Sequence, residues 1–388
     1  MNFDFTDDQK AIREGVRAVA TRFDDHYWLA RDEDGKFPTE FHQAMAEGGW
    51  LGITMPTEYG GSGLGVTEAA IMMHEVAQHG GGMAAVSTVH INLFGPHPIV
   101  VYGTPEQKQR WIPRLVAGKD QCCFGVTEPD AGLDTTKIRT FAKKVPGGYS
   151  VSGQKIWTTT AQVANKILLL TRTTPLEECK KPTEGMTIFY TDLDRTKVQV
   201  TRIAKMGRKA VDSNSVFIDD LFIPEADRID EEGKGFACLL HSLNPERIIV
   251  AAEAIGIGQD ALGRASNYAR ERRVFGRTIG QNQGIQHPLA INWIELEAAF
   301  ALVMKAAWLY DNGRPCGPEA NAAKFLGARS AHSACENAVM THGGLGYAKE
   351  YHVERLYREV ILTRIAPVSE QLILSFIAER VLGQVKSY

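Results

Sequence analysis

The spacing of apolar residues changes twice along the chain and divides it into three regions. From about residue 6 to residue 117, apolar side chains recur every three or four positions, which is the period of an amphipathic helix. Ile12, Val16 and Phe23 show this spacing after Thr6, a residue type that caps helix N-termini. Further helices are expected over residues 66–78 and from Pro105, because proline is favoured in a first helical turn.

From residue 122 to about residue 224 the period shortens to two, and turn-forming residues separate the apolar runs. This pattern predicts strands at residues 149–157, 166–171, 186–193, 198–203 and 215–218. Helical spacing returns from about residue 235 in four blocks, with breaks near 276–286, 313–318 and 342–346. Helices, then strands, then helices, without a βαβ rhythm, predict the α+β class. We expect an N-terminal α-helical domain (1–120), a central β-domain (121–230) and a C-terminal α-helical bundle domain (231–388).

The composition narrows the classes of partner. The 388 residues are 44% hydrophobic and 23% charged with a formal net charge of −3, which is typical of a soluble globular protein of more than one domain. No basic stripe is interleaved with aromatic residues, and no apolar run reaches membrane-spanning length. We therefore expect no nucleic-acid partner and no membrane partner.

The cysteines and the N-terminus indicate the compartment. Six cysteines are scattered along the chain without C-x-x-C spacing, which favours reduced thiols and argues against a metal site. The first eight residues are acidic and do not resemble a signal or transit peptide. Both observations lead us to expect a cytoplasmic protein.

Two motifs about thirty residues apart carry most of the chemical information. The first, Phe-Gly-Val-Thr-Glu-Pro-Asp-Ala-Gly at residues 124–132, is an apolar run that ends in a Pro/Gly turn. The second, Gly-Gln-Lys-Ile-Trp-Thr-Thr at residues 153–159, combines one large aromatic ring with hydroxyl groups, and a Pro-Gly-Gly hairpin signal at 146–148 lies between them. Either motif alone is a common turn or core sequence. A flat ring, hydroxyls and glycine-freed amides together suit an isoalloxazine and a pyrophosphate.

Jointly the two motifs resemble the flavin-binding β-domain of the acyl-CoA dehydrogenases, and the resemblance extends over about residues 6–383. It implies the fold of that family, with a central β-barrel or sandwich and a C-terminal four-helix bundle, and it implies FAD as cofactor. The matching residues are expected to line the isoalloxazine (Phe124, Val126, Thr127), pack on its face (Trp157), bond near N5 (Thr159) and lie at the pyrophosphate (Gly132, Leu133). Leu133 stands where the family usually has Ser, so one phosphate contact is missing.

Two later segments match positions that reach the FAD of a neighbouring subunit in this family. They contribute Arg272, Phe275 and Gln283 from one segment, and Met340, Gly343 and Gly344 from a glycine-rich turn. The resemblance therefore implies a homotetramer. The alternative for the first segment is a helix end with a solvated basic patch. Ser369 and Gln371 are expected near the flavin by the same correspondence.

The catalytic base is expected at Glu246. Most acyl-CoA dehydrogenases carry it in a Glu-Gly-Thr loop near the C-terminus, but the matching residues here are Pro367, Val368 and Ser369. The isovaleryl and long-chain enzymes place the base on a helix instead, and Glu246 occupies that position, directly before Arg247. Glu370 is the competing candidate. The alternative for Glu246 itself is a solvated helix acid that pairs with a nearby arginine.

The resemblance also implies a substrate pocket, formed by Ser87, Phe94, Leu243, Asn244, Arg247, Ala366 and Pro367. In this family the backbone N–H at the position of Pro367 helps to hold the thioester carbonyl. Proline has no N–H, so Val368 or Ala366 would have to supply the donor.

The implied function is FAD-dependent α,β-dehydrogenation of an acyl-CoA to the trans-2-enoyl-CoA. A base would abstract the α-proton, the β-hydrogen would leave as hydride to flavin N5, and an electron-transferring flavoprotein would accept the electrons. Three alternatives stay open: a dehydrogenase of a carrier-protein-bound acyl group, a flavin monooxygenase or oxidase of the same fold, and a non-catalytic FAD-binding or regulatory member.

A Gly-x-Gly-x-x-Ala sequence at residues 256–261 matches the dinucleotide-binding fingerprint. Its surroundings are helical, and residue 281, where an acidic ribose partner would be needed, is Gln. We interpret these glycines as sites of close helix packing.

Overall fold

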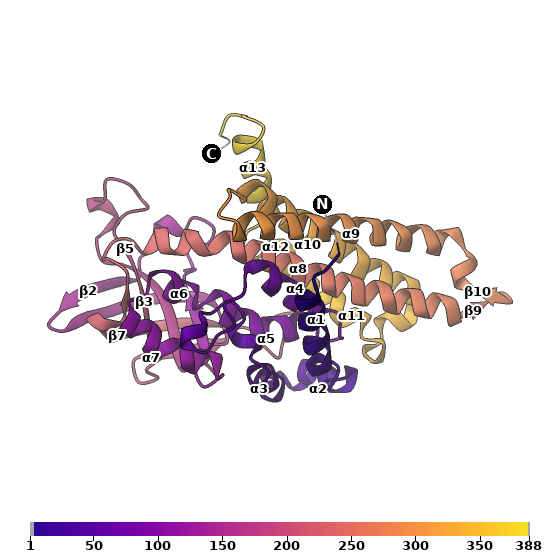
Figure 1. Cartoon of the computed structure of the whole chain (residues 1–388), viewed down its shortest axis with the longest axis horizontal. Helices are drawn as coiled ribbons and strands as arrows, with labels where there is room; N and C mark the ends of the chain where they lie inside the picture. Colours follow the sequence, from indigo (N-terminus) through magenta and orange to yellow (C-terminus); the bar gives the residue numbers. More distant parts are fainter. Residues whose placement is uncertain (1–3, 387–388) are drawn as a thin grey trace.

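In the computed structural model the sheet domain lies at one end of the molecule (left in Figure 1), and the N-terminal and C-terminal helices pack together beside it. The structure describes residues 4–386, except for the side chain of Phe94. The N-terminal helices are α1 (Asp7–Ala20), α2 (Asp25–Asp34), α3 (Thr39–Glu47), α4 (Val66–Ala77), α5 (Gly82–Phe94), α6 (His97–Tyr102) and α7 (Pro105–Val116). The predicted capping of the first helix is confirmed, since the Thr6 side chain accepts from the Gln9 N–H in a capping box.

The central domain is one mixed sheet with strand order β6-β7-β3-β2-β4-β5-β8, and β1 pairs in parallel with β4. Its strands are β1 (Cys122–Gly125), β2 (Phe141–Val145), β3 (Gly148–Thr159), β4 (Lys166–Arg172), β5 (Met186–Asp192), β6 (Val198–Arg202), β7 (Ser213–Pro224) and β8 (Arg228–Ile229). The predicted hairpin joins β2 to β3, with Val145 opposite Gly148. All five predicted strand segments are present in the structure.

The C-terminal region contains three long helices, α8 (Gly235–Glu271), α9 (Gln283–Asp311) and α10 (Gly317–His342). A two-stranded hairpin, β9 (Arg273–Val274) and β10 (Arg277–Thr278), joins α8 to α9 at the far end from the sheet domain (Figure 1). The chain ends in α11 (Val353–Val360), α12 (Leu362–Ile365) and α13 (Glu370–Arg380). The predicted helix–sheet–helix architecture is thus confirmed.

One hydrophobic core joins the two helical regions, because buried residues of α4 and α5 pack together with those of α8, α9 and α10. Gly256 shows why glycine is needed there: an added Cβ would lie 2.5 Å from the His74 carbonyl oxygen. At Gly258 it would lie 2.8 Å from the Cα of Ala331. Both glycines therefore serve close helix packing, as the sequence indicated.

Among the described residues, one segment is long and apolar enough to cross a membrane by length and composition, Val353–Arg380. In the structure this segment is not one continuous helix. It is divided into α11, α12 and α13, with breaks at Ile361 and at Ala366–Ser369.

Candidate active site

The two sequence motifs lie side by side, the first starting at the end of β1 and the second in the last part of β3. The Ile156 N–H donates to the Thr127 carbonyl over 2.9 Å. Below this bond, the ammonium of Lys155 lies 2.8 Å from a carboxylate oxygen of Glu128 and donates to the Val126 carbonyl over 3.0 Å. Because Lys155 is fully buried, desolvation lowers its pKa to about 8. The buried ion pair between Lys155 and Glu128 therefore holds the two motifs together.

Glu128 stabilises the Pro/Gly turn from inside. Besides Lys155, its carboxylate accepts hydrogen bonds from the backbone N–H groups of Arg139 and Thr140. The turn leaves Gly132 and Leu133 exposed, and a Cβ added to Gly132 would meet no atom within 4 Å. A phosphate can approach the backbone closely at a glycine because no side chain blocks it. The Leu133 side chain can offer no hydrogen bond there.

Trp157 presents its indole to open space on this platform. The side chain is 56% exposed, and its backbone has a φ of 61°, in the left-handed region. It lies in an irregularity of the β3–β7 pairing, between Lys155 and Thr158. A left-handed tryptophan is unfavourable in isolation, and such strain clusters at ligand sites. An exposed ring carried on a strained backbone fits the stacking role expected of Trp157.

Arg208, which the sequence analysis missed, links the sheet to α5. One guanidinium nitrogen donates to the Ser87 hydroxyl over 3.2 Å, and another donates to the hydroxyls of Thr159 and Ser213 over 3.3 and 2.9 Å. Within the described residues, no carboxylate lies within 4 Å of this guanidinium. Burial accordingly lowers its pKa. Arg208 thus connects Ser87, expected at the substrate, with Thr159, expected at the flavin.

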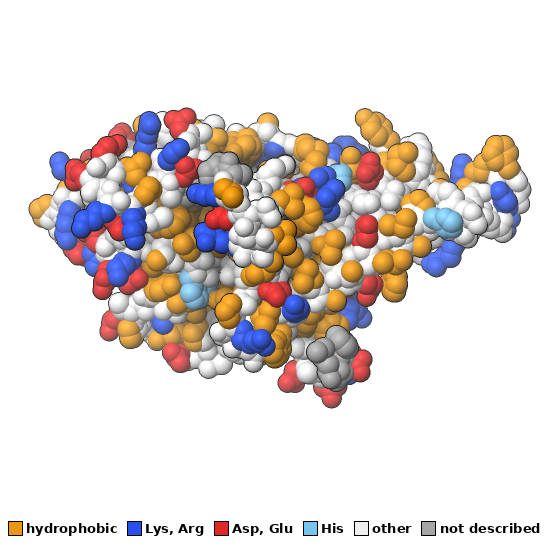
Figure 2. Space-filling model, turned by 90° about the horizontal axis from the view of Figure 1, so that it is seen from above, with side chains coloured by type: hydrophobic (Ala, Val, Ile, Leu, Met, Phe, Trp, Pro, Cys, Tyr) orange, Lys and Arg blue, Asp and Glu red, His pale blue; other side chains and the backbone are white. Residues whose placement is uncertain are grey.

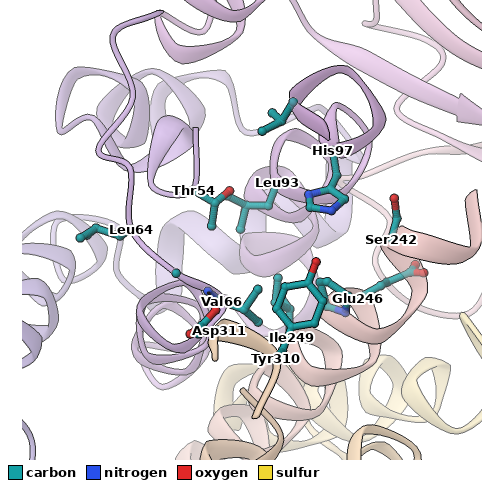
Figure 3. Close-up of a pocket in the computed structure, with 13 residues that line it drawn as sticks. Thr54, Leu64, Val66, Leu93, His97, Ser242, Glu246, Ile249, Tyr310 and Asp311 are labelled. Carbon is teal, nitrogen blue, oxygen red and sulfur yellow. Dashed lines mark hydrogen bonds between the residues drawn. The ribbon is translucent and has the colours of Figure 1, made fainter. Parts of the chain in front are cut away.

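Glu246 lines a cavity between α8 and the N-terminal helices (Figure 3). The cavity measures about 180 Å³, and its apolar walls include Leu93 and Ile249. Glu246 is only 7% exposed, and the described residues include no ion-pair partner for it. Burial therefore raises its pKa to about 7. Glu246 is therefore not a solvated helix acid that pairs with a nearby arginine, which was the alternative that the sequence left open.

Glu370, the competing candidate, is held in a different way. Its two carboxylate oxygens accept from the Arg364 guanidinium over 2.6 and 3.0 Å. This contact lowers the pKa of Glu370, which makes it a weaker base. Glu370 also does not line the cavity.

A second buried acid, also missed, lies two turns along α8 from Glu246. The Glu253 carboxylate lies 2.8 Å from Nδ1 of His90, which α5 contributes. Glu253 raises the pKa of His90 against the effect of burial, and His90 in turn lowers the pKa of Glu246. The sequence marks each residue but not their pairing: His90 is the one titratable group between His79 and His97, and Glu253 is the one between Arg247 and Asp260.

The loop that replaces the usual Glu-Gly-Thr segment follows α12, with a cis peptide bond between Ala366 and Pro367. The Ala366 N–H is already used, because it donates to the Leu362 carbonyl over 2.9 Å. The Val368 N–H has no hydrogen-bond partner among the described residues, while its carbonyl accepts from Lys324 over 2.6 Å. Of the two donors left open by the sequence, only Val368 is available.

The other residues expected at the substrate or in the loop differ in whether their polar groups already make hydrogen bonds. Arg247 donates to the Asn244 side chain over 3.0 Å, and Leu243 beside them is half-buried. Ser369 caps α13 by accepting from the Leu372 N–H, so its hydroxyl has a structural use. Gln371 is exposed in the first turn of α13. Phe94 falls outside the described side chains.

The remaining cofactor candidates lie away from Trp157 in the same chain. Arg272 and Phe275 belong to the β9–β10 hairpin at the far end of α8, Gln283 opens α9, and the side chain of Phe275 is 100% exposed (Figure 1). Figure 2 shows orange hydrophobic side chains at the tip of this arm. Exposed residues at the end of α10 form a second group: Met340 in its last turn, and Gly343 and Gly344 directly after it. The chain does not bring either group to its own sheet platform.

Three acyl-CoA dehydrogenase domain families match the chain: the N-terminal domain over residues 6–119, the middle domain over 123–221 and the C-terminal domain over 233–382. Acyl-CoA dehydrogenase FadE12 of Mycobacterium tuberculosis is 34% identical over 385 residues, which cover 99% of this chain and 98% of that protein. The caffeyl-CoA reductase-Etf complex subunit CarC of Acetobacterium woodii is 34% identical, with coverage of 92% and 93%.

Solved structures are consistent with these matches to domain families and relatives. Butyryl-CoA dehydrogenase from Megasphaera elsdenii superimposes with a TM-score of 0.93 and 29% identity, covering 98% of this chain and all of that one. The FAD complex of PigA has a TM-score of 0.93 at 25% identity, and it covers 99% of both chains.

Proposed function

Since this chain belongs to the acyl-CoA dehydrogenase family, a family of flavoprotein oxidoreductases, we propose that it is an FAD-dependent acyl-CoA dehydrogenase with Glu246 as its catalytic base. The observation that carries the proposal is the contrast between two carboxylates. Glu246 is buried at a cavity, without an ion-pair partner among the described residues and with a pKa of about 7, whereas Glu370 is bound to Arg364.

The platform residues fit FAD. Trp157 offers an exposed ring face, Thr127 and Thr159 offer hydroxyls, and the open turn at Gly132 leaves room for phosphates. Phe124 and Val126 form the strand end beside them. When bound, FAD would accept a hydride from the substrate β-carbon. Arg208 would orient Thr159 and Ser87 on the two sides of that reaction.

Removal of the α-proton falls to Glu246. A thioester α-hydrogen is weakly acidic, so its removal needs a carboxylate with a pKa near the working pH in a site that excludes water. Apolar Ile249 and Leu93 line the same cavity and provide such surroundings. The N–H of Val368, which has no partner among the described residues, would hold the thioester carbonyl, in the role that Pro367 cannot fill.

The assembly is also part of the proposal. Arg272, Phe275 and Gln283 are exposed far from the chain's own platform, and so are Met340, Gly343 and Gly344. In a homotetramer these residues would complete the FAD site of a neighbouring copy. An electron-transferring flavoprotein would reoxidise the cofactor; CarC, the relative in an Etf complex, supports this choice. We expect a cytoplasmic enzyme.

The first experiment is an anaerobic titration of the purified, FAD-loaded protein with short, branched and long acyl-CoAs. Loss of the visible flavin absorbance with one class of ester is the expected result. A protein that holds FAD but is reduced by no CoA ester would contradict the proposal, and reduction by a carrier-protein thioester instead would establish the alternative substrate.

A further inference from the structure

The cavity beside Glu246 is not lined as a pocket for a plain alkyl chain would be. Its walls are largely apolar, yet besides Thr54 three neutral hydrogen-bonding side chains, each from a different helix, open into it: Ser242 of α8, His97 of α6 and Tyr310 of α9. Figure 3 shows the Tyr310 hydroxyl directed toward the part of the cavity where His97 lies. Polar groups in an apolar site need partners, and a ligand can provide them.

Two of the three groups lack a partner within the described residues. The Ser242 hydroxyl is buried and makes no hydrogen bond, although a helical serine could bond back to its own helix. The Tyr310 hydroxyl likewise makes no hydrogen bond to any described residue, and burial raises its pKa to about 12, so it remains a neutral donor. An unpaired buried hydroxyl costs free energy unless something occupies the cavity.

The third group, His97, is paired with a second imidazole. Nε2 of His97 lies 3.3 Å from Nδ1 of His241, and the two rings stack at 18°. Burial lowers the pKa of His97 to about 4, so the ring carries no charge near neutral pH. His97 can therefore form a hydrogen bond with a ligand without presenting a positive charge to it.

The charges around the cavity exclude an anionic ligand. Two carboxylates line it, Glu246 and Asp311, and the lining contains no lysine or arginine. Asp311 is already occupied, because its oxygens accept from the N–H groups of Val66 and Thr67 at the start of α4. A ligand carboxylate would therefore meet negative charge and no counter-ion. The expected ligand is polar but neutral.

The volume limits the size of the ligand. A cavity of about 150 Å³ in a protein core is known to hold one benzene molecule. The cavity here, about 180 Å³, has room for a single ring or a short chain.

We propose that this cavity selects a short or single-ring acyl group whose distal end carries a neutral oxygen, such as a hydroxyl or keto group, through Ser242, His97 and Tyr310. The inference rests on the proposed function, since the cavity is taken as the acyl site of Glu246. It names the substrate class that the family assignment leaves open.

The test uses pairs of CoA esters in which a methyl group replaces a hydroxyl of the same size. Hexanoyl-CoA is compared with 5-hydroxypentanoyl-CoA, and 3-(4-methylphenyl)propanoyl-CoA with 3-(4-hydroxyphenyl)propanoyl-CoA. The rate of flavin reduction is measured with the FAD-loaded wild type, and Kd is measured by calorimetry with Glu246→Gln. We expect about a tenfold preference for the hydroxyl member of at least one pair in both measurements.

Tyr310→Phe and Ser242→Ala should each lower this preference severalfold by weakening the hydroxyl ester and leaving the methyl ester unchanged. Tyr102→Phe is the matched control, because Tyr102 contacts His241 edge-on, as Tyr310 does, but does not line the cavity. Ser330→Ala, a buried serine of α10, is the control for the second change.

Preference for the methyl member, or equal weakening of both members by Tyr310→Phe and Ser242→Ala, would overturn the inference and leave the proposed function intact. Failure of every CoA ester to bind or to reduce the flavin would overturn both.

Discussion

The ammonium of Lys155 and the carboxylate of Glu128, 2.8 Å apart and shielded from solvent, join the two motifs of the proposed flavin platform. The same Glu128 accepts two backbone N–H groups, so the pair fixes the turn and the strand end together. Removing one partner of such a pair leaves an uncompensated buried charge, which is more costly than removing both.

Lys155→Met is therefore expected to lower the free energy of unfolding by roughly 3–5 kcal/mol, as for other broken buried ion pairs. Urea denaturation of the FAD-free protein measures it. Adding Glu128→Gln to Lys155→Met should restore part of the loss. Lys144→Met is the control, because the Lys144 ammonium is exposed and lies 3.8 Å from Glu225. A Lys155→Met protein as stable as the Lys144→Met protein would show that the pair does not hold the platform.

Glu246→Gln should lower the rate of flavin reduction by roughly 10²–10⁴, the contribution of a general base, while Glu370→Gln keeps most of the activity. Stopped-flow reduction with the best CoA ester measures both. The assignment would be wrong if Glu370→Gln were the inactive variant.

The stability of Glu246→Gln relative to wild type should depend on pH. The folded-state pKa of Glu246 is raised from 4.5 to about 7, so the folded protein binds more protons than the unfolded chain between these values. The contribution of the protonated Glu246 carboxyl group to folding stability is therefore present below about pH 4.5 and is lost as the pH rises through about 7. From pH 5 to pH 8 the Gln variant should gain about 2 kcal/mol relative to wild type. Unfolding curves at the two pH values test this, and a difference independent of pH would contradict it.

His90→Gln should move the midpoint of the pH–rate profile upward. The reaction needs Glu246 deprotonated, so the rate should rise through about pH 7 in the wild type. His90, Arg247 and Lys324 lower this pKa, while Glu253 raises it. Loss of His90 removes a favourable charge and leaves Glu253 unpaired, and both effects raise the pKa.

The double variant His90→Gln/Glu253→Gln should return the midpoint toward that of the wild type, because it also removes the unpaired carboxylate. A loss of rate without a shifted midpoint would indicate a merely structural role for His90. The profile of single-turnover flavin reduction between pH 5.5 and 9 distinguishes the two.

Arg208→Met should weaken flavin retention and slow reduction, because Thr159 and Ser87 lose the donor that orients them. Arg208→Lys should recover little, since one ammonium cannot reproduce contacts made by two guanidinium nitrogens to three hydroxyls. The dissociation constant of FAD and the rate of reduction are measured separately. Wild-type values for both in Arg208→Met would remove Arg208 from the site.

Phe275→Ala should leave the thermal stability of the isolated chain nearly unchanged, because the side chain is fully exposed within it. It should nevertheless weaken FAD retention if the hairpin completes the site of a neighbouring copy. Sedimentation and flavin content measure the two effects. Trp308→Ala, which removes an exposed aromatic ring from α9 instead of the hairpin, serves as the control for lost surface area.

The sequence by itself determined the order of the elements and the position of the main motifs. Thr6, the 146–148 hairpin signal and the alternating strands act through local backbone preferences, which operate over a few residues. It also made Glu246 the candidate base, since the loss of a carboxylate in one motif and its gain in another are both visible in the chain.

Only the tertiary structure decided which of these groups can act, because burial and pairing depend on residues distant in sequence. Arg364 binds the Glu370 carboxylate, and the Leu362 carbonyl accepts the Ala366 N–H, whereas Glu246 has no ion-pair partner in the part of the chain that the structure describes. Arg208 reaches Ser87 across 121 residues of chain, and His90 reaches Glu253 across 163, distances at which no local pattern carries a signal. The sequence indicated the type of reaction, and contacts between residues distant in sequence determined which candidate groups are available for it.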